Sequence, residues 1–388
     1  MNHPITITGI GILSPLGIGV EETVAALREG ESAIMPCSRF TPPAGVSPRC
    51  GEVPAFLIDD YLNAPKAYLD RNSELLLAAT GMALRHAGID TTKLTPERAG
   101  ILVGTAWAGE DTMAAFFADY VQKGPRLVKP FLFQHTYFNT AISLAAMEWS
   151  LRGVHQSFAS GRVAAGQAIV EACDLLVDNE ADVILAGGSE ALGPMLFRTL
   201  AAQGWLKPAG DAAAPGLVPG EAGAMLVLER QSSAAARGAK VLGTILGCGL
   251  GGCGVSPNPP SGVAARVSRA AAADTAAATG CGGPGGPALP GIADAVASAL
   301  QHAGIAASDL ALVVSSANGQ AAVDAAEAAV AGKCPVLAPA TLCGDTLGAC
   351  AALHLALAVL QAANGPVLVL ATDVAGAGVA VVIGTAGT

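Results

Sequence analysis

The side chains with catalytic or metal-binding chemistry in this 388-residue sequence do not form a complete set of any common type. The nine cysteines are an odd number at irregular spacings, without a Cys-x-x-Cys pair or a histidine at zinc-finger spacing. We therefore expect most of them to be small core residues. Asp324 and Glu327 lie at one predicted helix start but have no histidine at metal-ligand spacing, so we expect solvated or capping roles and no metal site.

Two glycine motifs are also incomplete. Gly9 and Gly11 follow the start of a predicted strand, but the third glycine of a dinucleotide fingerprint and its acidic residue about 20 positions on are missing. Residues 187–191, Gly-Gly-Ser-Glu-Ala, lack the last glycine of a nucleophile elbow. The sequence therefore predicts no cofactor site.

Two charged residues, Arg162 and Asp345, lie where long helices of small residues are predicted to begin. Each helix is followed by a short turn and an apolar strand, so the sequence contains an internal repeat. Arg162 lies 23 residues before Leu185, and Asp345 lies 24 residues before Val369. The two copies cover helix 163–177 with strand 183–188, and helix 346–362 with strand 367–371. The repeat indicates two related α/β halves, although two such units could also resemble each other by chance.

The other predicted elements alternate between strands and helices, which is typical of an α/β fold with strands buried on both faces. We expect strands at 5–13, 100–104 and 224–229, helices at 21–29 and 73–87, and loops at 207–220, 249–262 and 280–291. At about 150 residues per domain, the length fits two or three domains or one fold of two halves. The repeat favours halves at 1–235 and 236–388.

Composition excludes several classes of protein. Charged residues make up 13% of the chain, about half of the ~25% that is usual in soluble domains, because alanine and 48 glycines are abundant. His354 and Asp373 interrupt the longest apolar stretches, so we expect no membrane span. A net charge of −10 argues against nucleic-acid binding. The first apolar run has no basic region before it, so we expect no signal peptide and a cytoplasmic location.

Five segments in order along the chain resemble the β-ketoacyl-ACP synthases, or ketosynthases, of the thiolase superfamily. They are residues 7–17, 181–191, 220–229, 324–328 and 344–349. The resemblance implies an α/β, thiolase-like, five-layered αβαβα fold made of two pseudo-repeated halves, in agreement with the internal repeat.

The positions that match the family's catalytic residues are all altered. The family's nucleophilic cysteine at the start of a buried helix is matched by Arg162, and a guanidinium cannot attack a thioester. Asn318 matches the first histidine, with two residues omitted after it, and Asp345 matches the second. The family's lysine falls near Ala340 and its gating phenylalanine near Ala375. We therefore predict no catalytic residue, and the loss of both histidines also disfavours a decarboxylase-only ketosynthase.

Two questions about this site stay open in the sequence. Cys343 could be a substitute nucleophile, but without a matching histidine a small buried thiol is favoured. Arg162 at a helix start needs an anion, because the helix dipole and burial both oppose its charge. We predict an ion pair with Asp345, since the family brings these two positions to one site. The alternative is that Arg162 reaches a partner or an anionic ligand.

A subunit that keeps the fold but loses the nucleophile resembles the chain-length factor of type II polyketide and aryl polyene systems. Such a subunit pairs with an active ketosynthase and shapes the tunnel that holds the growing chain delivered by acyl carrier protein. The helix after residues 104–109 matches the tunnel segment, so Trp107, Thr112, Met113 and Phe116 are candidate gate residues, unless they form a core or dimer-packing stripe. The alternatives are a stand-alone module that binds an acyl chain or acyl carrier protein, and an enzyme with residual acyltransferase activity.

Overall fold

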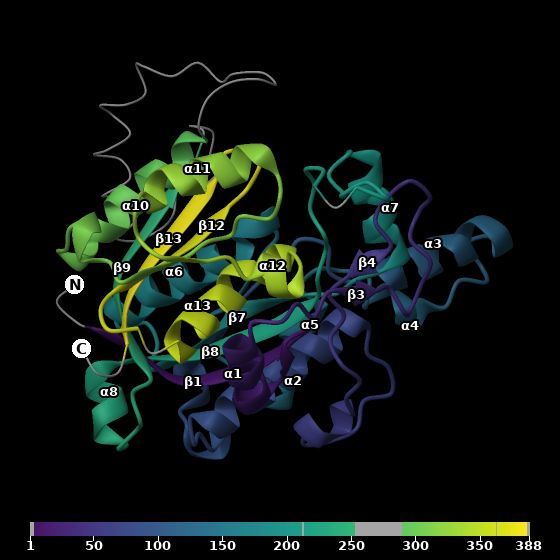
Figure 1. The fold of residues 1–388 in the computed structure, drawn as a ribbon. Coiled ribbons are helices and arrows are strands. Elements are labelled where there is room, and N and C mark those ends of the chain that lie inside the picture. The colour runs from purple at the N-terminus through teal and green to yellow at the C-terminus, as the bar shows by residue number, and fades with distance from the viewer. Residues whose placement is uncertain (1–3, 212, 253–288, 362, 386–388) are drawn as a thin grey trace.

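The described part of the chain contains one large mixed sheet and a separate pair of short strands (Figure 1). This computed structural model describes residues 4–211, 213–252, 289–361 and 363–385. The large sheet has the order β11-β10-β12-β13-β9-β1-β8-β7-β5-β6, with β2 beside β1. Its strands are β1 (Ile5–Ser14), β2 (Gly17–Ile18), β5 (Ala99–Gly104), β6 (His155–Phe158), β7 (Val183–Glu190), β8 (Ala222–Arg230), β9 (Gly243–Gly251), β10 (Leu312–Val314), β11 (Val336–Leu337), β12 (Val367–Thr372) and β13 (Gly378–Thr385). The separate pair is β3 (Met35–Pro36) and β4 (Arg49–Cys50).

The strand order contains the same five-strand arrangement twice. In the first half, β6, β5 and β7 are parallel neighbours, and β8 and β1 follow in antiparallel pairing. In the second half, β11, β10 and β12 are parallel, and β13 and β9 follow in antiparallel pairing. The two halves join where β1 pairs with β9. This topology confirms the internal repeat predicted from the sequence.

Helices complete five layers. On the outer face of the first half lie α2 (Arg71–His86) and α5 (Thr140–Glu148), and on that of the second lie α10 (Pro290–Ala303) and α11 (Ala321–Ala331). Between the halves lie α6 (Ala164–Val177) and α13 (Cys350–Leu360), which contact strands of both. The remaining helices are α1 (Gly19–Glu29), α3 (Glu110–Lys123), α4 (Pro130–Phe133), α7 (Pro194–Ala202), α8 (Gln231–Ala236) and α12 (Ala340–Cys343). Short 3-10 turns are η1 (Ile58–Tyr61), η2 (Thr91–Lys93), η3 (Pro96–Arg98), η4 (Gly161–Val163), η5 (Ala307–Asp309) and η6 (Leu347–Ala349). The predicted α/β, five-layered fold is therefore confirmed.

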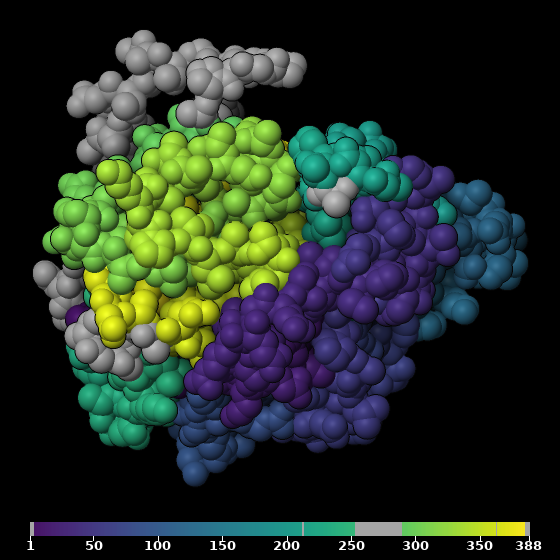
Figure 2. Space-filling model, viewed as in Figure 1, coloured from purple at the N-terminus to yellow at the C-terminus, as the bar shows by residue number. Residues whose placement is uncertain are grey.

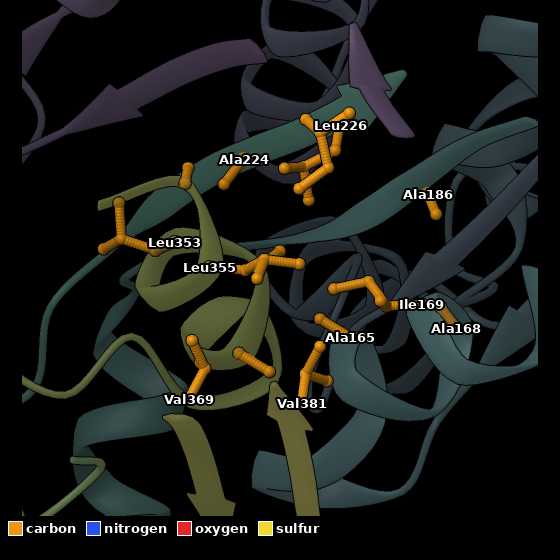
Figure 3. Close-up of a cluster of buried hydrophobic side chains, with 14 of the residues drawn as sticks. Ala165, Ala168, Ile169, Ala186, Ala224, Leu226, Leu353, Leu355, Val369 and Val381 are labelled. Atoms are coloured by element: carbon orange, nitrogen blue, oxygen red, sulfur yellow. The ribbon is translucent and has the colours of Figure 1, made fainter. Parts of the chain in front are cut away.

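The middle layer explains the uncharged composition. Figure 3 shows small and aliphatic side chains of α6 and α13 packed between strands of both halves. Ala165 and Ile169 on α6, Leu355 on α13, Leu226 on β8 and Val381 on β13 are all almost completely buried. Most positions of these two helices face the sheets, so alanine and other apolar residues predominate, and the polar residues Gln167, Glu171 and Asp174 of α6 are confined to its half-buried side.

Glycines let the outer helices lie unusually close to the first strand of each half. A Cβ atom at Gly11 of β1 would lie 1.9 Å from the Ala79 carbonyl oxygen of α2. A Cβ at Gly249 of β9 would lie 1.9 Å from the Ala295 carbonyl oxygen of α10. Gly11 therefore serves helix packing, and the same contact recurs in the second half.

Most predicted elements lie where the sequence placed them, with two exceptions. The predicted loop 249–262 is wrong at its start, because residues 249–251 continue β9 and pair with β13. The predicted loop 280–291 is wrong at its end, because Pro290 begins α10, where proline at the first helical position costs no hydrogen bond. The rest of both predicted loops, apart from Gly252 and Leu289, lies outside the described residues.

Candidate functional site

The two buried helices begin with equivalent turns. Gly161 opens η4 before α6 with φ 65°, and Leu347 opens η6 before α13 with φ 44°, both in the left-handed region. Aligned on these turns, Gly348 is the counterpart of Arg162. The sequence-based equivalence of Arg162 with Asp345 is therefore wrong by three residues. Asp345 instead lies in an extended segment before the turn, where its backbone bonds to Val218 and Gly220.

Arg162 and Asp345 nevertheless meet, and the predicted ion pair is confirmed. The distance from Arg162 Nε to Asp345 Oδ2 is 3.0 Å, and the two side chains are only 5% and 1% exposed. The guanidinium also donates to the carbonyl oxygens of Ser316, at 2.5 Å, and Thr372. Burial opposes the charge of Arg162, but Asp345 raises the pKa of the guanidinium above its usual value. Arg162 is thus a fully bonded cation inside the fold.

Asn318 extends this pair into a network. Its Nδ2 donates to Asp345 Oδ2 at 2.6 Å, and the Leu347 amide donates to Asp345 Oδ1 at 3.0 Å. Three of the four positions matched to the family's cysteine, two histidines and lysine are therefore joined by hydrogen bonds. Ala340, the fourth, is half-buried at the start of α12 and has no polar side-chain atom to contribute. The network fixes the charged groups of Arg162 and Asp345 in position, and it contains no nucleophile.

Asp373 provides a second carboxylate at the same site. Its Oδ2 accepts the backbone amide of Arg162 at 3.2 Å, and its Oδ1 accepts the amide of Ala375 at 2.8 Å. A backbone amide at the start of a buried helix is a typical donor to an anion or oxyanion. The protein's own carboxylate therefore takes that donor at the nucleophile position. Sequence reasoning noted Asp373 only as a break in an apolar stretch, although a carboxylate directly after a buried strand was the available signal.

A cavity of about 200 Å³ lies beside this network. Its walls are mostly apolar, with Arg162, Gln320 and Asp373 as the polar groups, and its apolar lining includes Trp107, Trp205, Leu217, Leu347 and Val374. A second cavity of about 20 Å³ lies nearby and is lined by polar residues that include Asn72, Glu110 and Glu190. Trp107 lines both cavities.

The cysteines near the site are not activated. Cys343 donates to the Pro339 carbonyl at 3.2 Å, and Cys350 to the Arg162 carbonyl at 3.2 Å. Burial raises the pKa of each thiol to about 12. Since the thiolate is the attacking species, neither is a nucleophile at neutral pH. Cys343 is the small buried thiol that the sequence favoured.

The four candidate gate residues point in different directions. Trp107 and Met113 are 37% and 39% exposed, whereas Thr112 is buried and hydrogen-bonds Tyr68 at 2.7 Å. Phe116 is half-buried and packs against Phe133, with ring centroids 5.7 Å apart. The structure therefore brings Trp107 to the cavity beside Arg162 and places Met113 on the surface of α3.

The region around α3 and α4 presents an exposed apolar surface, which we term the aromatic face. It projects from the body of the molecule (Figure 2). Its members are Met113, Phe117, Tyr120, Val121, Leu127, Phe131, Phe133, Tyr137 and Phe138. Five of the nine phenylalanines of the chain lie between residues 116 and 138, a concentration that sequence reasoning did not use. A patch of this kind is typical of a protein interface.

Metal and membrane features can be stated for the described residues. Among them, no group of three or more His, Cys, Asp or Glu side chains is arranged to hold a metal ion. None of the helices found there is long and apolar enough to cross a membrane.

This chain is similar both to solved structures and to curated proteins of known family. The structure titled "The ishigamide ketosynthase/chain length factor" superposes with a TM-score of 0.83 at 24% identity and covers 99% of this chain and 100% of its own. A ketosynthase in complex with its chain length factor from Xenorhabdus doucetiae gives 0.74 at 17% identity, covering 99% of this chain and 98% of its own. A 3-oxoacyl-[acyl-carrier-protein] synthase 2 from Vibrio harveyi is 29% identical over 269 residues. That match covers 66% of this chain and about 65% of the relative's length.

The family model described as "Beta-ketoacyl synthase, N-terminal domain" matches residues 2–234, which is more than half of the chain. The fold, the position of Arg162 at the start of the buried helix and these matches lead to one conclusion. The chain belongs to the β-ketoacyl synthase family of the thiolase superfamily.

Proposed function

We propose that this chain is a catalytically inactive, chain-length-factor-like subunit that pairs with an active β-ketoacyl-ACP synthase. The observation that carries the proposal is the Arg162–Asp345–Asn318 network, whose members the sequence resemblance matches to the family's nucleophile and both histidines. Asp373 supports it, because its carboxylate takes the Arg162 amide. Chain length factors are also named in two of the similar structures.

The aromatic face and strand β6 support association with a partner subunit. β6 is the edge strand of the first half, and His155 and Gln156 on it are exposed. An edge strand presents unpaired backbone groups that can add a strand from another chain. The edge of β6 and the aromatic face are two surfaces that support binding of a ketosynthase.

In the proposed pair, the ketosynthase supplies the cysteine and two histidines. It takes an acyl chain from acyl carrier protein and condenses it with a malonyl unit, while this subunit shapes the tunnel. Trp107, Thr112, Met113 and Phe116 are the proposed gate residues, with Thr112 acting through its bond to Tyr68. The products would be a polyketide, a polyene such as an aryl polyene, or a fatty-acid-like chain, made in the cytoplasm.

The cavity beside Arg162 supports a second candidate, a stand-alone module that binds an acyl chain. Its volume of about 200 Å³ and mostly apolar lining are suitable for a short hydrocarbon segment. Residual acyltransferase activity has less support, because Cys343 and Cys350 are buried with raised pKa values.

Co-expression distinguishes these functions. The chain is expressed alone and together with an intact ketosynthase from the same genome, with acyl carrier protein present. The proposed function predicts that the ketosynthase co-purifies with this chain and improves its solubility. A soluble, isolated chain that binds acyl groups and captures no ketosynthase would instead support the stand-alone module.

A further inference from the structure

Glu190 is a completely buried carboxylate that none of the preceding roles uses. It ends β7, its side chain is 0% exposed, and no Lys or Arg of the described residues forms an ion pair with it. Three backbone amides donate to it: Ala106 at 2.6 Å, Trp107 at 3.0 Å and Gly348 at 3.2 Å. Its hydrogen-bond donors are thus backbone amides, while Asp345 and Glu110 are the carboxylates that interact with it electrostatically.

The three amides belong to two segments that are far apart in the sequence. Ala106 and Trp107 lie between β5 and α3, and Gly348 lies in the turn that begins α13. Glu190 Oε2 accepts the amides of Ala106 and Gly348, whereas Oε1 accepts that of Trp107. One carboxylate therefore ties the segment that carries Trp107 to the start of a middle-layer helix.

Keeping a carboxylate here is energetically unfavourable, since burial raises the pKa of Glu190 to about 7 although the three amides lower it. A neutral side chain would avoid this desolvation cost but could not accept all three amides. The buried carboxylate therefore holds residues 106–107 in place at a cost to the stability of the folded state. Trp107 is the residue through which this contact reaches the cavities, because its own amide is held and it lines both of them.

We propose that Glu190 is the positioning residue of Trp107 and thereby sets the shape of the two cavities that Trp107 lines. Only the expected effect on product length rests on the proposed function, in which Trp107 is a gate residue. In the heterodimer, a displaced indole would change the space available at the subunit interface and hence the product length.

The test uses Glu190→Gln in the full chain labelled with fluorotryptophan. A glutamine has one oxygen, so its amide group must face at least one of the three N–H donors and repel it. The chain has three tryptophans, and Trp107→Phe assigns the fluorine NMR resonance of Trp107. The matched control is Glu327→Gln, another buried carboxylate, which bonds Ser315 and Ser316 and does not contact Trp107.

We expect Glu190→Gln to shift and broaden the Trp107 resonance while the other two tryptophan resonances stay in place, and Glu327→Gln to leave all three unchanged. Glu190→Asp, which keeps the charge but shortens the side chain, should shift the same resonance less. An unchanged Trp107 resonance in both Glu190 variants would overturn the proposal. If Glu190→Gln does not fold, Glu190→Asp alone decides between these outcomes.

Product length, measured with the ketosynthase partner, separates this proposal from the proposed function. A shifted Trp107 resonance together with an altered product length supports both the positioning role and the gate. The condition is that the double variant Glu190→Gln, Trp107→Phe gives the same product length as Trp107→Phe alone. A shifted resonance with unchanged product length supports the positioning role and contradicts the gate.

Discussion

Arg162 Nε lies 3.0 Å from Asp345 Oδ2, and this buried pair joins the first half of the fold to the second. The sequence resemblance matches these two positions to the family's nucleophile and one of its histidines. Arg162 also bonds the carbonyl oxygens of Ser316 and Thr372, so the guanidinium fixes three segments of the second half around the start of α6. The altered site therefore connects the two halves of the fold through buried hydrogen bonds.

Asp345→Asn should destabilise the protein strongly. The change preserves shape but leaves Arg162 as a buried cation without its counter-charge, and breaking a buried pair costs about 3–5 kcal/mol. Denaturant unfolding followed by circular dichroism measures the loss. Asp294→Asn, on the exposed side of α10, is the control and should have little effect. Equal stability of the two variants would mean that the ion pair contributes nothing.

Arg162→Cys should not create an active enzyme. The new thiol would lie at the position matched to the nucleophile, but Asp373 would still hold the backbone amide, and the positions matched to the two histidines carry Asn318 and Asp345. Intact-protein mass spectrometry after incubation with acyl-ACP should show no acyl adduct on the folded variant. An active ketosynthase in the same assay is the positive control, and an adduct on the variant would show that the site retains catalytic capacity.

His354 should make the stability depend on pH. Burial, and then the charge of Arg162, lower the pKa of His354 to about 4, against about 6.5 in an unfolded chain. The unfolded state binds the proton more tightly, so this contribution increases as the pH rises from about 4 to 6.5, by up to about 3 kcal/mol.

The measurement compares wild type with His354→Leu, a residue type that already flanks the position. The difference in unfolding free energy between the two proteins should grow over this pH range in favour of wild type. A constant difference would contradict neutral burial of the imidazole. Glu190 contributes an opposite slope to both proteins, because its raised pKa makes the fold less stable as the pH rises towards 7.

The aromatic face should be required for partner binding. Phe117→Asp and Phe133→Asp place a charge on a surface that the proposed pair would bury, and both side chains are about half exposed here. We expect at least a tenfold loss of affinity for the ketosynthase, because an unpaired buried charge costs several kcal/mol. Val336→Asp, on exposed strand β11 at the opposite edge of the sheet, is the matched control. Equal binding by all three variants, each folded, would remove the aromatic face from the interface.

The sequence predicted the parts of the site that depend on helix starts and family motifs. Arg162 and Asp345 were found because family motifs flank them, and their ion pair was predicted because a buried Arg162 at a helix start needs an anion. Asp373 and Glu190 were given no role because their partners are backbone amides of distant segments, so the only signal in the sequence was their position at the end of a buried strand. The Asp373 contact, for example, joins residues 211 positions apart.

The repeat also shows a limit of pattern reading. Its order of helix and strand was predicted correctly, but its register at Arg162 was wrong by three residues. Small-residue helices give no strong periodicity that fixes where the helix begins, and the extended backbone contact of Asp345 with Val218 depends on a distant segment. Loop predictions failed for a related reason, since Gly249 reads as a loop residue until α10 packs against it.

The central claim is that this chain is the inactive member of a pair, and mass spectrometry of the reconstituted pair tests it most directly. The complex with an intact ketosynthase is incubated with acyl-ACP, and both subunits are weighed under native and denaturing conditions. The account predicts one copy of each subunit and an acyl adduct on the ketosynthase alone. An acyl adduct on this chain, or the absence of a complex between the two subunits, would contradict it.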